Sequence, residues 1–363
     1  MDTTIEINST ALKLERYPVT TDASLRAWSN AELLALDYIK DKKTTQIHLF
    51  NDRFGVWNCA LQHQKITTIW TYASQQKAVL HNLKLNNISS DVDFKTPLDD
   101  LEKVDTVLLK IPKSLELFEL FLQQIHKASH EKTTVVCGFM TKYFSASFLK
   151  IASRYFEDVS QSKAHKKARL LILESPKKIT EHKELLQNIN WKNDVLQQYY
   201  GVFSSGNIDI GTQFLLENLE VKSTEKTVLD VASGNGIIAF EIAKKQPEVT
   251  ITLVDDFNLA IASSKINLKD KKAVFVCEDT LQNLPKETFD LVVSNPPFHF
   301  EHENNIEVTL LLFKGVYNCL HTNGRFLLVA YSHLNYQTHL RTIFSDVEIL
   351  KENKKFQILS CRK

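Results

Sequence analysis

Between Lys226 and Ser332 the sequence alternates apolar stretches typical of strands with stretches whose apolar residues recur at helical spacing. The β-branched segments TVLDV, VTITLV and FDLVVS are followed by segments with this helical period. Strands that alternate with helices predict parallel strands joined by crossover helices, and therefore a doubly wound α/β sheet.

The first half of the chain repeats this plan in weaker form. IHLFNDRFGVWNCAL corresponds to TVLDVASGNGIIAF, QQKAVLHNLKLNNI to NLAIASSKINLKD with Asn86 opposite Asn267, and KAHKKARLLIL to KENKKFQILSC. Because the matches keep their order, we interpret the chain as a duplicated fold; chance similarity between short apolar strands is the alternative. Composition turns polar near residues 174–187 of the 363, so we predict domains 1–178 and 179–363.

The two copies differ at the glycine turn. NDRFGVW stands in place of SGNG, and KIPK stands in place of NPPF. Bulky Arg53 and Phe54 would obstruct a ligand that must touch the backbone of the turn. We therefore expect the N-terminal copy to have kept its fold and lost its ligand.

In the second half, polar groups follow the strand ends one after another. Glycines in DVASGNG allow close approach of backbone to a ligand, and an acidic pair about 20 residues later has the spacing that binds ribose hydroxyls. A third glycine at the dinucleotide spacing and a GK[ST] motif are both missing, which favours a nucleoside without phosphates, most commonly S-adenosylmethionine. An acid after the next strand could accept from adenine, although a surface turn is the alternative. The expected cofactor-binding residues are Asp230, Gly234, Asn235, Gly236, Asp255, Asp256, Asp279 and Asn295.

Asn295-Pro296-Pro297-Phe298 ends the last strand of this series. Two prolines stop strand pairing and hold the Asn295 side chain and nearby carbonyl oxygens in place. We expect Asn295 and the Pro296 carbonyl to accept N–H groups of a flat aromatic amine, and Phe298 to stack on its ring; these three are the catalytic candidates. The following HFEHE segment lacks regular metal-ligand spacing, so we expect no metal.

In this order the motifs resemble those of class I S-adenosylmethionine-dependent methyltransferases that act on amino groups. The segments LERYPVTTDASLRAWSNAELLALDYI, GVFSSGNIDIGTQFLLENL, NPPFH, YSHLNY and NKKFQIL are similar to those of the bacterial large-subunit (23S) ribosomal RNA guanine-N2 methyltransferases. The small-subunit (16S) guanine-N2 methyltransferases are near relatives. One departure is that the family often has DLGCGNG where this chain has Ala232 and Ser233.

The resemblance implies two tandem Rossmann-like class I methyltransferase domains, of which the N-terminal one is degenerate. It implies one S-adenosylmethionine, bound by the C-terminal copy, and methylation of a guanine N2 amine in 23S ribosomal RNA. It also implies that Phe203 packs over cofactor or target, a core phenylalanine being the alternative, that Asp209 and Thr212 complete the cofactor site, and that the N-terminal copy helps to hold RNA.

Local charge indicates where RNA would bind. The net charge is only +1, but the run KAHKKAR is densely basic. RNA phosphates are its expected partners, and a solvated surface is the alternative reading. The expected RNA-binding residues are Lys163, Lys166, Lys167 and Arg169.

The remaining sequence features indicate the cellular compartment and the partners of the protein. The N-terminus does not resemble a secretory signal, no apolar run approaches a membrane span, and the five cysteines form no CxxC pair, so we expect a cytoplasmic protein without a membrane partner. Ribosomal RNA, naked or in an assembly particle, is the expected partner and DNA is not; a monomer is compatible with the sequence, which leaves the oligomeric state open. The alternatives are a 16S enzyme, methylation of adenine N6 or of a protein glutamine, and a non-catalytic RNA-binding assembly factor.

Overall fold

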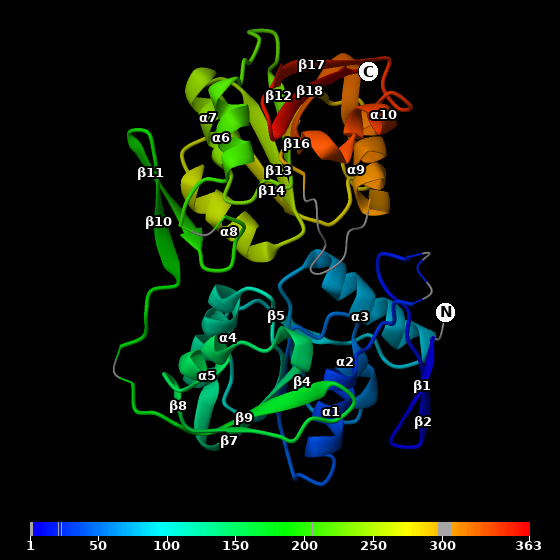
Figure 1. Cartoon of the computed structure of the whole chain (residues 1–363), viewed down its shortest axis with the longest axis vertical. Helices are drawn as coiled ribbons and strands as arrows, with labels where there is room; N and C mark the ends of the chain where they lie inside the picture. Colours follow the sequence, from blue (N-terminus) through cyan, green and yellow to red (C-terminus); the bar gives the residue numbers. More distant parts are fainter. Residues whose placement is uncertain (1–2, 21, 23, 180, 205, 297–305) are drawn as a thin grey trace. The chain divides into compact units, whose positions relative to one another are not determined.

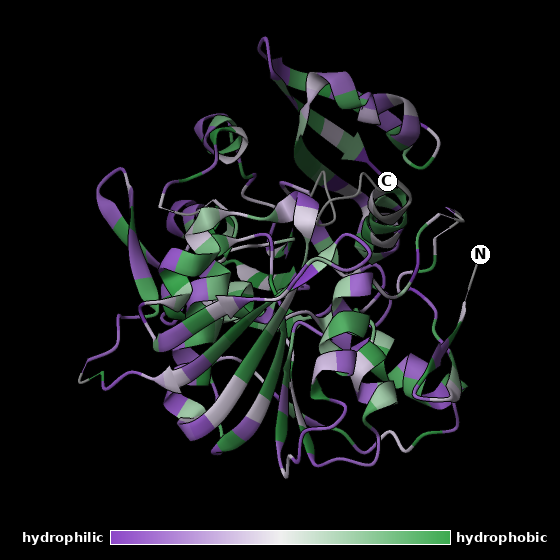
Figure 2. Ribbon diagram, turned by 60° about the horizontal axis from the view of Figure 1, so that its bottom comes forward, coloured by the Kyte–Doolittle hydropathy of each residue, from purple (hydrophilic) through white to green (hydrophobic). Residues whose placement is uncertain are grey.

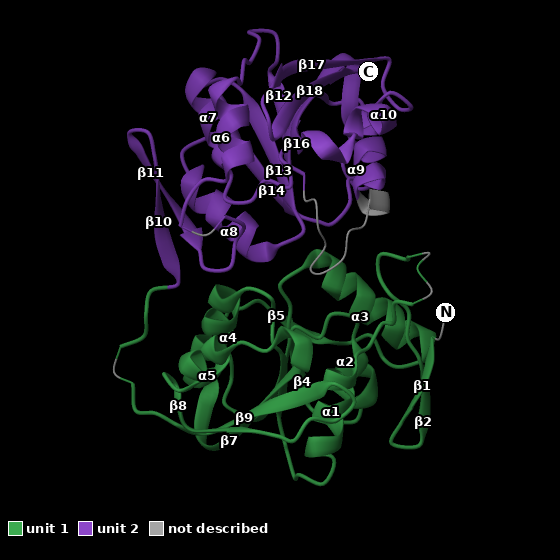
Figure 3. Ribbon diagram, in the orientation of Figure 1, with its two compact units in different colours: residues 1–184 green, residues 185–363 purple. Residues whose placement is uncertain are grey.

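The computed structural model describes residues 3–20, 22, 24–179, 181–204, 206–296 and 306–363. The chain divides into two compact units, residues 1–184 and 185–363 (Figure 3). Each unit holds a seven-stranded sheet with helices on both faces (Figure 1). None of the helices in the described ranges has the length and apolar character needed to cross a membrane.

The sheet of the C-terminal unit has the order β14-β13-β12-β15-β16-β18-β17. Its first five strands are parallel, and β18 runs antiparallel to both of its neighbours. The strands are β12 (Thr227–Val231), β13 (Thr250–Asp255), β14 (Ala273–Cys277), β15 (Phe289–Ser294), β16 (Leu320–Tyr331), β17 (Asp346–Glu352) and β18 (Phe356–Arg362), preceded by the hairpin β10 (Leu186–Trp191) and β11 (Asp194–Tyr199). The helices are α6 (Ile210–Glu217), α7 (Ile237–Lys245), α8 (Asn258–Asn267), α9 (Ile306–Cys319) and α10 (Tyr336–Leu340), with a 3₁₀ turn η2 (Ser332–Leu334).

The N-terminal unit has the matching order β5-β4-β3-β6-β7-β9-β8. Its strands are β1 (Thr4–Ile7), β2 (Thr10–Lys13), β3 (Ile47–Phe50), β4 (Ile66–Ile69), β5 (Asp93–Lys95), β6 (Val104–Lys110), β7 (Ser129–Met140), β8 (Phe156–Gln161) and β9 (Ala168–Pro176), where β1 and β2 form a separate hairpin. Its helices are α1 (Asn30–Ile39), α2 (Val56–Ala60), α3 (Ala73–Leu85), α4 (Leu115–Ala128) and α5 (Ala146–Ala152), with a 3₁₀ turn η1 (Thr141–Tyr143).

Both faces of the C-terminal sheet are buried. Successive strand residues point to opposite faces, so Val228 packs with the apolar side chains of α6 and α7, whereas Leu229 packs with those of α9 and α10. This two-sided burial explains the unbroken apolar runs that predicted parallel strands. In Figure 2 hydrophobic segments recur along the strands, interspersed with hydrophilic ones, while the loops at the surface are mainly hydrophilic.

The predicted duplication is confirmed in detail. Asn86 and Asn267 have the same role: Asn86 exchanges two hydrogen bonds with the backbone of Lys13 in β2 (2.8 and 2.7 Å), and Asn267 does so with Gln197 in β11 (2.8 and 2.9 Å). Each asparagine therefore connects the C-terminal end of a helix, α3 or α8, to the hairpin that precedes the sheet of its unit.

The glycine turn of the N-terminal unit is filled by side chains. Arg53 is only 3% exposed and Phe54 only 5%, and the Arg53 guanidinium lies 5.2 Å from the Tyr72 ring centroid. At the end of β6, Lys110 pairs with the buried carboxylate of Glu32 from α1 at 3.3 Å. The loss of ligand-binding space that we expected for this copy agrees with these contacts.

Candidate active site

The loop between β12 and α7 has an unusual backbone. Ala232 (φ +56°), Gly234 (φ +56°) and Gly236 (φ +79°) all lie in the left-handed region. A Cβ on Gly236 would stand 2.7 Å from Leu268 Cδ1, so this position requires glycine. A Cβ on Gly234 would meet nothing within 4 Å, which means that open space borders the loop at this residue.

Side chains from α8 hold this loop from behind. Ser264 Oγ donates to the Gly234 carbonyl at 2.9 Å, and Asn267 Nδ2 donates to the Asn235 carbonyl at 2.8 Å. The loop is thus fixed before any ligand arrives. Neither Ser264 nor Asn267 was predicted from the sequence to belong to the site. Asn267 was noted only because it matches Asn86 in the first half.

Two acids lie beneath and beside the loop. Asp230 is fully buried in β12, where its Oδ2 accepts from the Ala239 N–H of α7 at 3.1 Å, and burial raises its pKa to about 8. Asp255, at the end of β13, accepts from the Gly234 N–H and the Phe257 N–H, both at 2.9 Å. Burial raises the pKa of Asp255 to about 6, against the opposing effect of these two hydrogen bonds.

These groups fit a cationic nucleoside such as S-adenosylmethionine. Among the described residues, Asp230 Oδ1 and Ser233 Oγ are buried without a hydrogen-bond partner. Buried carboxyls with raised pKa values gain from a nearby positive charge, and this donor carries an ammonium and a sulfonium. A carboxylate has about four lone-pair sites, so Asp255 can accept from ribose hydroxyls while it holds the loop.

Asn295 lies immediately after β15 and is half-buried. Its Nδ2 donates to Thr212 Oγ1 at 2.8 Å and to Asp209 Oδ2 at 3.2 Å. Asp209 is the N-cap of α6, and its Oδ2 also accepts from the N–H groups of Gly211 and Thr212. Because both acceptors lie on the Nδ2 side, the orientation of the amide is set and Oδ1 points away from them.

Phe203 is not a core residue, because its side chain is 66% exposed. Its backbone is connected to the glycine loop through the buried Gln198. Gln198 Nε2 donates to the carbonyls of Val202 (3.0 Å) and Phe203 (3.3 Å), and Gln198 Oε1 accepts from Asn235 Nδ2 at 2.8 Å. The alternative of a core phenylalanine is therefore wrong, and Gln198 is a positioning residue that sequence reasoning missed.

The other predicted residues of this unit lie at the neighbouring strand ends or outside the described part of the chain. Asp256 and Asp279 are half-buried after β13 and β14, and the Glu278 N–H donates to the Asp255 carbonyl at 3.0 Å, which brings these two strand ends together. Pro296 is buried. Phe298 and the HFEHE segment lie outside the described residues.

The predicted RNA-binding residues surround a tight turn between β8 and β9. Lys166 and Lys167 have φ of +45° and +63°, and His165 exchanges two backbone hydrogen bonds with Ala168 across them. Both lysines and Lys163 are exposed, whereas Arg169 is half-buried and donates to Gln161. Since Ala168 pairs with Met140 at the end of β7, the turn lies at the carboxyl edge of the N-terminal sheet.

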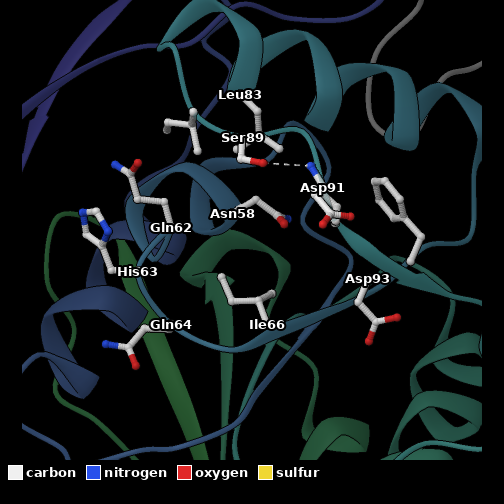
Figure 4. Close-up of a pocket in the computed structure, with 12 residues that line it drawn as sticks. Asn58, Gln62, His63, Gln64, Ile66, Leu83, Ser89, Asp91 and Asp93 are labelled. Carbon is white, nitrogen blue, oxygen red and sulfur yellow. Dashed lines mark hydrogen bonds between the residues drawn. The ribbon is translucent and has the colours of Figure 1, made fainter.

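A cavity of about 820 Å³ lies elsewhere in the N-terminal unit (Figure 4). Its lining includes Ile66 and Asp93, the first residues of β4 and β5, and the polar Gln62, His63 and Gln64 after α2. It therefore opens at the amino edge of the sheet. Open α/β sheets bind their ligands at the carboxyl edge, so this cavity is separate from the predicted site.

Two family models match the chain. Residues 2–178 match the RLMG N-terminal domain, and residues 194–360 match the methyltransferase small domain. The fold is shared with the 16S rRNA N2 methyltransferase of T. thermophilus solved with AdoMet and guanosine, with a TM-score of 0.79 and 18% identity over 99% of this chain and 97% of that one.

The sheet order, the glycine loop and the small-domain match define a methyltransferase of the class I type. The curated relative "Ribosomal RNA large subunit methyltransferase G" of Psychromonas ingrahamii is 31% identical over 99% of this chain and 98% of its own length. The chain belongs to the ribosomal RNA large subunit methyltransferase G family.

Proposed function

We propose that the chain transfers a methyl group from S-adenosylmethionine to the N2 amine of a guanine in 23S ribosomal RNA. The observation that carries this proposal is the hydrogen-bonded orientation of Asn295 beside a preformed, open glycine loop. Residues 179–363 are the catalytic domain and residues 1–178 a degenerate domain that recognises RNA. The reaction takes place in the cytoplasm, on naked RNA or on an assembling particle.

Asn295 orients the amine. A guanine N2 nitrogen is a poor nucleophile because its lone pair is shared with the ring. Since Nδ2 of Asn295 donates to Thr212 and Asp209, its Oδ1 can accept one N–H of the amine while the Pro296 carbonyl accepts the other. Holding both protons makes the nitrogen more pyramidal and aims its lone pair. Alignment of this kind contributes at most about 7–11 kcal/mol to catalysis.

S-adenosylmethionine, when bound, supplies an electrophilic methyl group on a sulfonium. The residues that would hold it are Phe203, Asp230, Gly234, Asn235, Gly236, Asp255, Asp256, Asp279 and Asn295. Phe298 stacks on the target base, worth about 1–3 kcal/mol, and the base must leave its stack to reach the site. No strong base is needed, because the proton can leave after methyl transfer.

The turn that carries Lys166 and Lys167 binds RNA phosphates. Both side chains are exposed, and their backbone is held by the contacts of Lys166 O with Asn30 (2.8 Å) and of Lys167 O with Thr141 (2.8 Å). Two exposed ammonium groups on a held turn suit contact with a phosphate chain.

The test is methylation of unmodified ribosomal RNA by the purified chain with radiolabelled S-adenosylmethionine. Label in 23S RNA, recovered as N2-methylguanosine after nuclease digestion, is the expected result. Label confined to 16S RNA, DNA or protein would overturn the proposed substrate. Absence of donor binding in calorimetry at millimolar concentration would support an assembly factor instead.

A further inference from the structure

The C-terminal unit carries a lysine on a pair of aromatic rings at the carboxyl end of β16. Tyr331 and Phe356 are paired across β16 and β18, with ring centroids 4.8 Å apart. The ammonium of Lys355 lies 5.5 Å from the centroid of Tyr331 and 5.3 Å from that of Phe356, within the range of cation–π attraction. These residues come from the segments YSHLNY and NKKFQIL, to which the proposed reaction assigns no role.

The backbone under Lys355 is fixed. Asn353 Oδ1 accepts from the N–H groups of Lys355 and Phe356, both at 2.8 Å, and the Lys355 carbonyl accepts from the Ser332 N–H at 3.0 Å. The side chain of Lys355 is nevertheless exposed, and in the described part of the chain no carboxylate forms an ion pair with it. The result is a preorganised cation that lacks a protein counter-charge there.

This cation lies at the same edge of the sheet as the proposed catalytic amide. Ser294 pairs with Leu328 in the parallel ladder, so Tyr331 lies three residues further along, roughly 10 Å at about 3.3 Å per residue. Helix α6 contacts both places: Thr212 binds Asn295 at 2.8 Å, and a Cβ on Gly211 would stand 3.1 Å from the Phe356 ring. Both places therefore lie beside α6 at the carboxyl edge of this sheet.

The duplication supplies an internal comparison. In the N-terminal unit the same pairing position holds Met140 opposite Ala168, with no ring on either side. The backbone there is alike, since Thr141 N–H donates to the Lys167 carbonyl at 2.8 Å just as Ser332 N–H donates to that of Lys355. This corner of the fold therefore forms without the ring pair, which is present only in the copy with the open glycine loop.

We propose that Lys355, held on the rings of Tyr331 and Phe356, binds a backbone phosphate of the RNA next to the target guanine. Lys355 is the binding residue, and Tyr331 is a positioning residue that keeps the ammonium near the rings and restricts its rotamers. One phosphate contact next to the flipped base adds to the affinity for RNA without touching the reacting atoms. This inference rests on the proposed function, because it requires RNA as substrate.

The test compares Lys355→Ala with Lys354→Ala, the neighbouring exposed lysine for which the described structure gives no ring contact. We expect Lys355→Ala to raise the KM for RNA about 5–10-fold and to reduce the salt slope of binding by about 0.7–0.9, the value for one phosphate, with kcat and S-adenosylmethionine affinity unchanged. Lys354→Ala should change the KM less than 2-fold. An unchanged KM and salt slope in Lys355→Ala, or an altered donor affinity, would overturn the inference.

The role of Tyr331 has its own readout. Tyr331→Leu should raise the RNA KM as much as Lys355→Ala, the double variant should be no worse than either, and Tyr331→Phe should retain wild-type values. Additive effects would mean that Tyr331 acts independently of the lysine. If the wild-type chain methylates 23S RNA and Lys355→Ala behaves identically, this inference alone is refuted. If the wild-type chain leaves the RNA unlabelled, the proposed function is refuted.

Discussion

Two glycines of the same loop, Gly234 and Gly236, should respond differently to substitution by alanine. Both lie at positive φ, +56° and +79°, where an L side chain costs about 1–2 kcal/mol. They differ in what surrounds the added methyl group. Gly236 faces the interior, and Gly234 borders open space where we place the methyl donor.

The structure gives the magnitudes. On Gly236 the new Cβ would stand 2.7 Å from Leu268 Cδ1 and 2.9 Å from Ser264 Oγ, so overpacking adds about 1–3 kcal/mol to the backbone cost. Gly236→Ala should therefore lower the free energy of unfolding by about 2–5 kcal/mol. Gly234→Ala meets nothing within 4 Å and should lower it by only about 1–2 kcal/mol; Ala232 already adopts φ +56° in this loop.

Binding should show the reverse order. We expect Gly234→Ala to weaken S-adenosylmethionine binding at least 10-fold, because its methyl group occupies the space beside the loop. The assays are urea denaturation of both variants and calorimetric titration with the donor. Wild-type donor affinity in a folded Gly234→Ala variant would refute the placement of the donor against this loop. Equal loss of stability in the two variants would refute the packing argument.

Three further predictions concern single side chains. Asn295→Ala should leave donor binding largely intact, because the other residues named for the donor remain, and should lower kcat about 100-fold or more in the labelled-RNA assay, since the amine loses an orienting acceptor. Unchanged turnover would remove Asn295 from the mechanism. Burial raises the pKa of Asp230 from 3.8 to about 8, so its contribution to the free energy of unfolding is complete below pH 4 and declines by about 1.4 kcal/mol per pH unit as the pH rises toward 8. Urea denaturation at pH 5 and pH 8 should therefore show a smaller loss of unfolding free energy in Asp230→Asn than in the wild type. An equal loss in the two proteins would contradict this prediction. Arg325 is buried, and two of its nitrogens each donate to the Glu225 carboxylate at 2.9 Å. Glu225→Ala removes this carboxylate and should lower the free energy of unfolding by about 3–5 kcal/mol. A loss under 1 kcal/mol would show that water replaces the carboxylate.

Local patterns in the sequence were sufficient to predict the fold. Apolar runs with β-branched residues predicted the strands because both faces of each sheet are buried, so period and composition agree with the final environment. Asn86 and Asn267 matched in sequence because each makes the same backbone contacts in its own copy. The alternation of strand and helix patterns predicted the fold class, and the matched asparagines supported the duplication.

The support of the site could not be predicted in the same way. Gln198 reaches Asn235, and Ser264 reaches Gly234, across distances in sequence that no local pattern spans. Phe203 illustrates the same limit: it is 66% exposed and its carbonyl accepts from the distant Gln198, whereas its sequence context did not distinguish an exposed from a core phenylalanine. Strand ends bring motifs together, but the residues that hold those motifs come from helices and hairpins elsewhere.

The two copies differ in whether side chains fill the space beside the glycine turn. At the end of β6 the N-terminal copy places Lys110 against Glu32, and at the corresponding end of β15 the C-terminal copy places Asn295 against Thr212. Arg53 and Phe54 fill the first glycine turn, whereas Gly234 borders open space in the second. The same fold forms with this space filled, so its persistence in the C-terminal copy alone argues that a ligand binds there.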